Sequence, residues 1–230
     1  MRRLSILLLA AVLVLTTGGC DRHPESETAL SSLAPAGGSD VSLSPAQTVE
    51  RIHALRTEHR YAELIRHLNP HQATDILDFL LAMDELIAAE REVQAAARQC
   101  PGVRATDCSL GDLANSQGVF SERLRVVSER VEADRAAVTI QIADMLPLET
   151  VELESVGGRW VYSVESPAGP LPDALRDLAR AMRRFGASLR AGPMGPDQFR
   201  AEFRLRISPR LRRITELTSV KIASRADRPE

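Results

Sequence analysis

The chain has 230 residues, of which 44% are hydrophobic and only 3% aromatic, with a formal net charge of −2. This composition predicts a globular protein with an aliphatic core and few rings on which bases or sugars could stack. Charge is uneven: residues 171–230 carry 14 basic and 7 acidic side chains, whereas the preceding residues carry 15 and 24. Because no nucleic-acid-binding motif accompanies the basic half, we expect no nucleic acid among the partners.

The start of the chain has the pattern of a bacterial lipoprotein signal. Two arginines follow Met1, an apolar stretch too short to span a bilayer ends near Leu15, and two glycines precede Cys20. We therefore expect residues 1–19 to be a signal peptide and Cys20 to carry the lipid, palmitate included. An ordinary secretory signal is the alternative, because Thr17 stands where lipoprotein signals usually have Leu or Val.

Location follows from this lipid anchor. The protein is expected on a cell membrane, facing the periplasm or the exterior. Asp21 resembles the signal that keeps lipoproteins in the inner membrane of bacteria that also have an outer one. Residues 20–45 are rich in Ser, Pro, Gly, Ala and acidic residues without hydrophobic period, so they are predicted to be a flexible tether.

Three helices are expected next. Ser44 as N-cap, Pro45 in the first turn and Gln47 three residues after the cap predict the start of the first helix. Its buried stripe is expected at Val49, Ile52 and Leu55. A short second helix covers 61–68, and a long third one begins after Asn69-Pro70 and runs toward Gln99. The third is apolar on more than one face, which predicts a sheet on one side and helices on the other.

The remaining cysteine pair, Cys100 and Cys108, encloses a Pro-Gly loop. In an exported protein such a pair predicts a structural disulfide, which would stabilise the fold by about 2 to 3 kcal/mol. A redox or metal role would require a Cys-x-x-Cys spacing or a nearby His, and neither is present.

After the cysteine loop the hydrophobic period changes from 3.6 to 2, which predicts a four-stranded antiparallel meander. Its strands are expected around 124–126, 138–142, 151–153 and 160–164. Gly157-Gly158 supplies the tight turn of the last hairpin. Trp160 and Tyr162 then share one face, and we expect them to pack on the long helix near Leu80 and Ile87 or to line the mouth of a pocket.

Two helices are predicted to close the fold, over 173–189 and 196–218, with a kink at Pro209. The fold class is thus α+β: N-terminal helices on a curved four-stranded meander, then a helical extension over 167–220. Residues 221–230 are expected to be a disordered tail.

The order of helices and sheet resembles the nuclear transport factor 2-like fold, as found in bacterial lipoproteins of unknown function. Three motifs carry the resemblance over residues 46–166: Arg60-Tyr-Ala-Glu-Leu-Ile-Arg-His-Leu-Asn-Pro70, Ala137-Val-Thr-Ile-Gln-Ile142 and Gly158-Arg-Trp-Val-Tyr162. The resemblance implies a sheet wrapped around a helix and a conical pocket, which some members use for catalysis and many for binding or assembly.

Ketosteroid isomerase-like members of that fold place an Asp base and an acidic hydrogen-bond donor in the pocket. No motif maps those roles here, so no catalytic residue is assigned. The side chains chemically able to fill them are Tyr61, Asp75, Asp78, Asp84 and Asp144.

No cofactor or metal is expected. His67 and His71 have the i, i+4 spacing that binds zinc on one helix, but a new helix begins between them. His53 and His59 are six residues apart and point to different faces of a helix.

The basic C-terminal helices have two interpretations. Their arginines either attract anionic lipid headgroups or pair with the acidic body and solvate helix faces, and we favour the second. The residues concerned are Arg176, Arg180, Arg183, Arg184, Arg190, Arg210, Arg212 and Arg213.

Together these features predict a membrane-anchored exported lipoprotein whose domain binds a small apolar ligand or an envelope protein without chemistry of its own. A pocket acid/base enzyme of the isomerase or dehydratase type and a structural envelope component are the alternatives.

Overall fold

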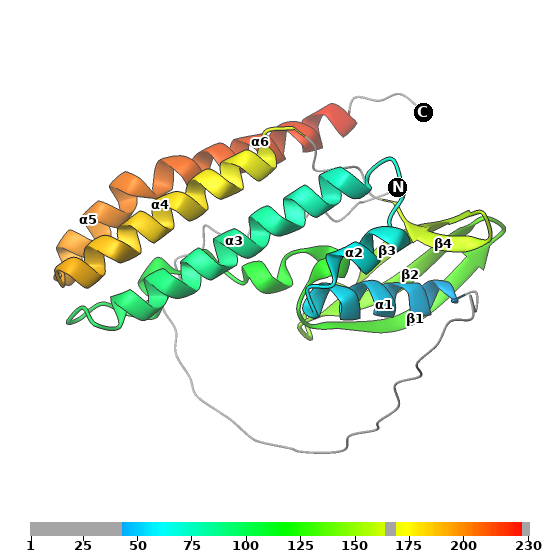
Figure 1. The fold of residues 1–230 in the computed structure, drawn as a ribbon, viewed down its shortest axis with the longest axis horizontal. Helices are drawn as coiled ribbons and strands as arrows, with labels where there is room; N and C mark the ends of the chain where they lie inside the picture. The colour runs from blue at the N-terminus through cyan, green and yellow to red at the C-terminus, as the bar shows by residue number, and fades with distance from the viewer. Residues whose placement is uncertain (1–42, 164–168, 227–230) are drawn as a thin grey trace, which may run out of the picture.

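The structure, a computed structural model, describes residues 43–163 and 169–226 as an α+β fold (Figure 1). A four-stranded antiparallel sheet carries helix α1 across one face, and the long helices α3 and α4 lie side by side next to this unit. The helices are α1 (Pro45–Thr57), α2 (Tyr61–Leu64), α3 (Ala73–Ala97), α4 (Leu171–Ala191), α5 (Pro196–Arg206) and α6 (Ser208–Ala226).

The sheet is a meander in the order β1-β2-β3-β4, as the alternating sequence predicts. Its strands are β1 (Leu124–Glu132), β2 (Arg135–Ile142), β3 (Glu149–Val156) and β4 (Arg159–Tyr162). Gly157 and Gly158 have φ angles of 60° and 77°, so the turn that the Gly-Gly pair predicts is confirmed. Between α3 and β1 the chain forms short 3-10 turns, η3 (Ala105–Cys108), η4 (Leu113–Asn115) and η5 (Gly118–Phe120), and η2 (Ile65–His67) follows α2.

The start of α1 is fixed both locally and from the sheet. Ser44 and Gln47 form the predicted capping box. A bulge between Val126 and Ser128 shifts the strand by one residue, so that Glu129 lies opposite the buried Val138. The Glu129 carboxylate therefore faces α1 and accepts a 2.8 Å hydrogen bond from the Ala46 amide, where a negative charge stabilises a helix.

Helix α1 covers the sheet. The sequence instead predicted that the sheet would pack on one side of the long helix, which is α3. Val49, Ile52 and Leu55 are fully buried, as predicted. In contrast, α3 packs chiefly along α4 (Figure 1). This contact between the two helices explains why α3 is apolar on more than one face. Gly186 of α4 faces Val93 of α3, and a Cβ at this position would lie 3.4 Å from the Val93 side chain, within contact distance.

The last predicted helix is divided in two. α5 ends at Arg206 and α6 begins at Ser208, directly before Pro209, whose ring and missing N–H prevent a continuous helix. Phe199 and Phe203 of α5 pack on Phe185 of α4 in tilted and edge-to-face geometry, with ring centroids 5.2 and 5.7 Å away, and this aromatic cluster holds the extension in place.

Trp160 and Tyr162 share the inner face of the sheet, as predicted, and both pack against the core. Tyr162 contacts Phe120 edge to face, with the ring centroids 5.6 Å apart. Helix α1 and the turn η5 both pack against the sheet. Val164, the expected end of the strand, lies outside the described residues.

Candidate functional site

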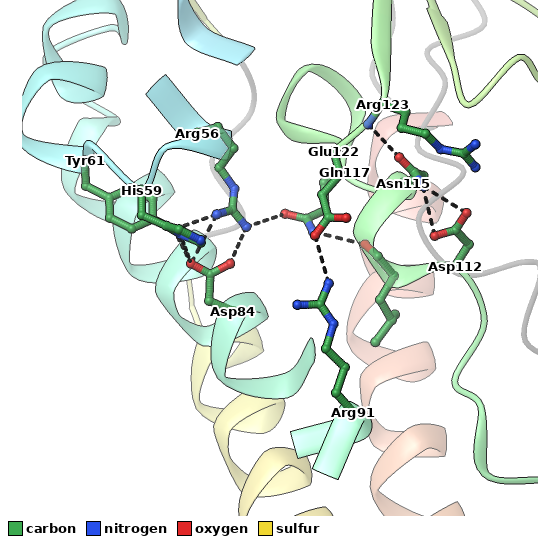
Figure 2. Close-up of polar contacts among 11 residues, drawn as sticks. Arg56, His59, Tyr61, Asp84, Arg91, Asp112, Asn115, Gln117, Glu122 and Arg123 are labelled. Carbon is green, nitrogen blue, oxygen red and sulfur yellow. Dashed lines mark hydrogen bonds and ion pairs between the residues drawn. The ribbon is translucent and has the colours of Figure 1, made fainter. Parts of the chain in front are cut away.

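A polar cluster around the buried Arg56 joins the end of α1, the start of α2 and the middle of α3 (Figure 2). Arg56, in the last turn of α1, is only 5% exposed. Its guanidinium binds both carboxylate oxygens of Asp84 on α3, donates to the Tyr61 hydroxyl at 2.6 Å and donates to the Gln117 side chain at 3.3 Å. The Arg56 charge is thus neutralised where solvation by water is lost.

Tyr61 completes this cluster from the first position of α2. Its hydroxyl donates to Asp84, and burial followed by this hydrogen bond raises the pKa of the phenol. The phenol is therefore protonated at neutral pH and acts as a donor. His59, which has a φ of 56°, places its Nδ1 3.2 Å from the Tyr61 hydroxyl and 3.4 Å from Asp84.

The hydrogen bonds of this cluster indicate a structural role, in which it links the three helices. Both oxygens of Asp84 and the Tyr61 hydroxyl already have partners within the protein, which leaves little capacity for a substrate. The sequence singled out Tyr61 and Asp84, and the structure brings them together. Arg56 and Gln117 were missed, although Arg56 stands seven residues after Val49 on the buried stripe of α1, where a charged residue requires a partner.

A second site is a solvent-open hollow of about 270 Å³ at the end of the sheet where β1 starts and β2 ends. It is lined by His53, Arg123, Leu124, Arg125, Gln141, Ala143 and Asp144. His53 comes from α1, the arginines and Leu124 from the start of β1, and the rest from the end of β2 and the loop after it. The hollow therefore forms where helix, edge strand and loop meet.

Positive charge dominates the lining of the hollow. The Arg125 guanidinium donates to the Gln141 amide oxygen, which leaves its charge uncompensated. Arg123 uses its backbone N–H for Asn115, while its guanidinium points away from Asn115 (Figure 2). Within residues 43–163 and 169–226, neither guanidinium forms an ion pair, and Asp144 is the one acidic residue of the lining.

His53 contributes a neutral ring to the hollow. Burial lowers the pKa of His53, although a main-chain hydrogen bond at Ser121 opposes the shift. Its Nδ1 is buried and has no hydrogen-bond partner in the described part of the chain. A neutral imidazole at pH 7 follows from this environment.

The loop beside the hollow, residues 143–148, is strained at its start and apolar at its tip. Ala143 and Asp144 have φ angles of 49° and 60°, which side chains other than glycine rarely adopt. The Ala143 amide donates to the Arg123 carbonyl at 3.0 Å and so ties the loop to β1. At the tip, three apolar side chains are 51%, 79% and 39% exposed: Met145, Leu146 and Leu148.

The other predicted polar residues lie apart from these two sites. Asp78 pairs with Arg176 of α4, and Asp75 lies in the first turn of α3. His67 and His71 are on either side of the break before α3, and no group of three metal-binding side chains occurs within the described ranges.

Of the eight C-terminal arginines named from the sequence, four form ion pairs with carboxylates of the described residues. Arg176 pairs with Asp78 and Glu85 of α3, and Arg183 lies within ion-pair distance of Glu85 and Glu92. Asp177 similarly receives Arg180 and Arg210. Arg176 and Arg183 thus pair the extension with acidic residues of α3, whereas the two pairs of Asp177 lie within the extension.

The cysteines are described only in part. Cys100 and Cys108 are both buried and are free thiols in the structure, so the expected disulfide is not formed there. Cys108 donates to the Ala105 carbonyl at 3.0 Å, and burial raises the pKa of this thiol to about 11. The expected lipidation site, Cys20, lies outside the described residues.

Comparisons with known proteins assign no family. No family model matches the sequence, and neither a curated protein nor a solved structure shows detectable similarity to it. Among the described helices, none is both long and apolar enough to cross a bilayer.

Proposed function

We propose that this protein is an exported lipoprotein, anchored to the cell membrane through Cys20, whose α+β domain binds a ligand or partner at the envelope without catalysing a reaction. The observation that carries the anchor is the sequence start: two arginines, a short apolar core and Gly18-Gly19 before Cys20. The inner membrane is the proposed location if the source has two, because Asp21 follows the cysteine.

The partners of the polar side chains support a binding role over a catalytic one. Tyr61 and Asp84, two of the five candidate acid/base residues, form their hydrogen bonds with Arg56 and with each other. The hollow instead presents uncompensated guanidinium groups, which favour recognition of an anionic group over proton transfer.

We also propose that residues 46–166 are a nuclear transport factor 2-like domain. Helices preceding an antiparallel meander support this assignment. An experimental structure tests it: the sheet should curl around α1 and enclose a conical cavity, and a flat open sheet would argue against the family.

Replacing the lipidated cysteine tests the anchor. The Cys20→Ser variant should move from the membrane fraction to the soluble fraction after a high-salt wash, whereas the control Cys108→Ser should stay with the membranes. A Cys20→Ser protein that still pellets after the wash would show that the anchor assignment is wrong.

A further inference from the structure

The hollow and the loop beside it combine two kinds of chemistry on one end of the sheet. Arg123 and Arg125 supply positive charge without a carboxylate partner, against the one carboxylate of Asp144. Directly after Asp144 come the exposed side chains Met145 and Leu146. Such a combination matches the boundary of a bilayer, where phosphate groups lie above the acyl chains.

The geometry of the meander separates this end of the sheet from the hairpin turns. In an antiparallel meander, the β2–β3 loop lies at one end and the β1–β2 and β3–β4 turns at the other. With strands of eight residues, the two ends are about 25 Å apart. Exposed apolar residues at the far end, such as Val156 at 43%, therefore serve as internal controls.

The anchor is long enough to let this end reach the membrane. The segment from Cys20 to Ser44 can extend to about 80 Å, roughly three times the length of the sheet. It joins the domain at the N-terminus of α1, which is held beside Glu129. The position of the anchor thus leaves the loop free to face the bilayer.

We propose that loop 143–148 and the adjoining arginines dock the domain onto anionic phospholipid, with Arg123 and Arg125 binding lipid phosphates and Met145, Leu146 and Leu148 entering the interface. This inference rests on the proposed lipid anchor. The partner that binds at the hollow is then the anionic surface of the membrane. The docked domain lies on the bilayer instead of standing off at the end of its tether.

The test uses the acylated full-length protein reconstituted into vesicles. A polarity-sensitive fluorophore is attached at Leu146→Cys or, as control, at Val156→Cys, while Cys100 and Cys108 stay unlabelled because they are buried. With phosphatidylglycerol mixed into phosphatidylcholine, the label at 146 should shift to shorter wavelength and the label at 156 should not. In pure phosphatidylcholine both labels should report water.

Charge variants give the sign of the interaction. Arg123→Gln and Arg125→Gln should each lower the ratio of docked to undocked protein about fivefold, which corresponds to about 1 kcal/mol per arginine near an anionic surface. Asp144→Asn should raise the ratio. The matched pair Arg130→Gln and Arg135→Gln, exposed at the opposite end of the sheet, should leave it unchanged.

Each other outcome overturns the proposal in a distinguishable way. If the vesicles float with the protein but the label at 146 stays in water, the docking fails and the anchor stands. If the protein does not float, both fail. A spectral shift that follows protein density instead of phosphatidylglycerol content indicates contact between copies. Stabilisation by inorganic phosphate that requires Arg123, with no spectral shift on vesicles, indicates a site for a soluble anion.

Discussion

Arg56 and Asp84 join α1 to α3 through a two-pronged ion pair in which the arginine side chain is 6% and the aspartate side chain 25% exposed. The pair links the layer that contains the sheet to the helical layer beside it. Asp84 also receives the Tyr61 hydroxyl, so its loss would leave both donors without their acceptor.

Removing the acceptor should therefore destabilise the protein strongly. We expect Asp84→Ala to lower the free energy of unfolding by about 2 to 4 kcal/mol, because it leaves a buried guanidinium unpaired. In an Arg56→Met background the same change should cost less than half as much. Denaturant titrations measure both values, and purely additive losses would contradict the coupling. Glu132→Gln, which breaks the exposed pair with Arg130, is the control and should have no measurable effect.

Glu90 provides a pH-dependent test. Its side chain is 6% exposed and accepts a 2.7 Å hydrogen bond from the Leu110 amide, and burial raises the pKa of its carboxyl. A raised pKa in the folded state means that ionisation above the usual carboxyl range costs stability. Glu90→Gln keeps the acceptor and removes the charge, so it should be more stable than wild type at pH 7.

The difference should shrink as the pH falls through the raised pKa of Glu90 toward its unfolded value, because the wild-type carboxyl is then protonated. Thermal melts between pH 4 and pH 8 measure it. A constant difference across this range would show that the charge of Glu90 carries no cost. Glu90→Ala should be destabilising at every pH, since it leaves the Leu110 amide without a partner.

Trp160 should contribute less to the free energy of unfolding than a fully buried aromatic ring does. It is half-buried on the inner face of β4, so we expect Trp160→Ala to cost about 1 to 3 kcal/mol instead of the 3 to 5 typical of core aromatics. Melting temperature measures the loss. Acrylamide quenching of the single Trp should show partial protection, and full exposure would contradict the register of β4.

The state of the cysteines can be read by alkylation. Since both thiols are buried and the pKa of Cys108 is raised to about 11, iodoacetamide at pH 8 should not label the native protein. In protein isolated from the exported fraction, the disulfide predicted from the sequence would block labelling even after unfolding until a reductant is added. Labelling on unfolding without reductant would instead establish free thiols.

Local signals in the sequence predicted local structure well. Ser44, Pro45 and Gln47 define the start of α1, Gly157-Gly158 defines the last hairpin, and alternation defines the meander, because each depends on residues that are close in the chain. The bulge at Val126 and Ser128 was not predicted, since an extra residue interrupts the period of two on which strand prediction depends.

Features that depend on distant partners were harder to predict. Which helix covers the sheet is decided by contacts between segments far apart in sequence, and the apolar faces of both α1 and α3 were compatible with that role. The partner of Arg56 lies 28 residues away, and the hollow forms only when α1, β1 and the β2–β3 loop meet. The candidate Asp residues could be identified from the sequence, but the residues that contact them in the fold could not.

The bulge in β1 has a consequence for self-association. β1 is an outer strand of the sheet, so its free backbone groups could recruit a strand from another copy of the chain. The extra residue breaks the regular spacing of those groups, and the charged side chains of Arg130 and Glu132 crowd the part that follows. The bulge therefore shortens the regular edge that β1 offers to a second copy, which is one way in which sheets limit association edge to edge.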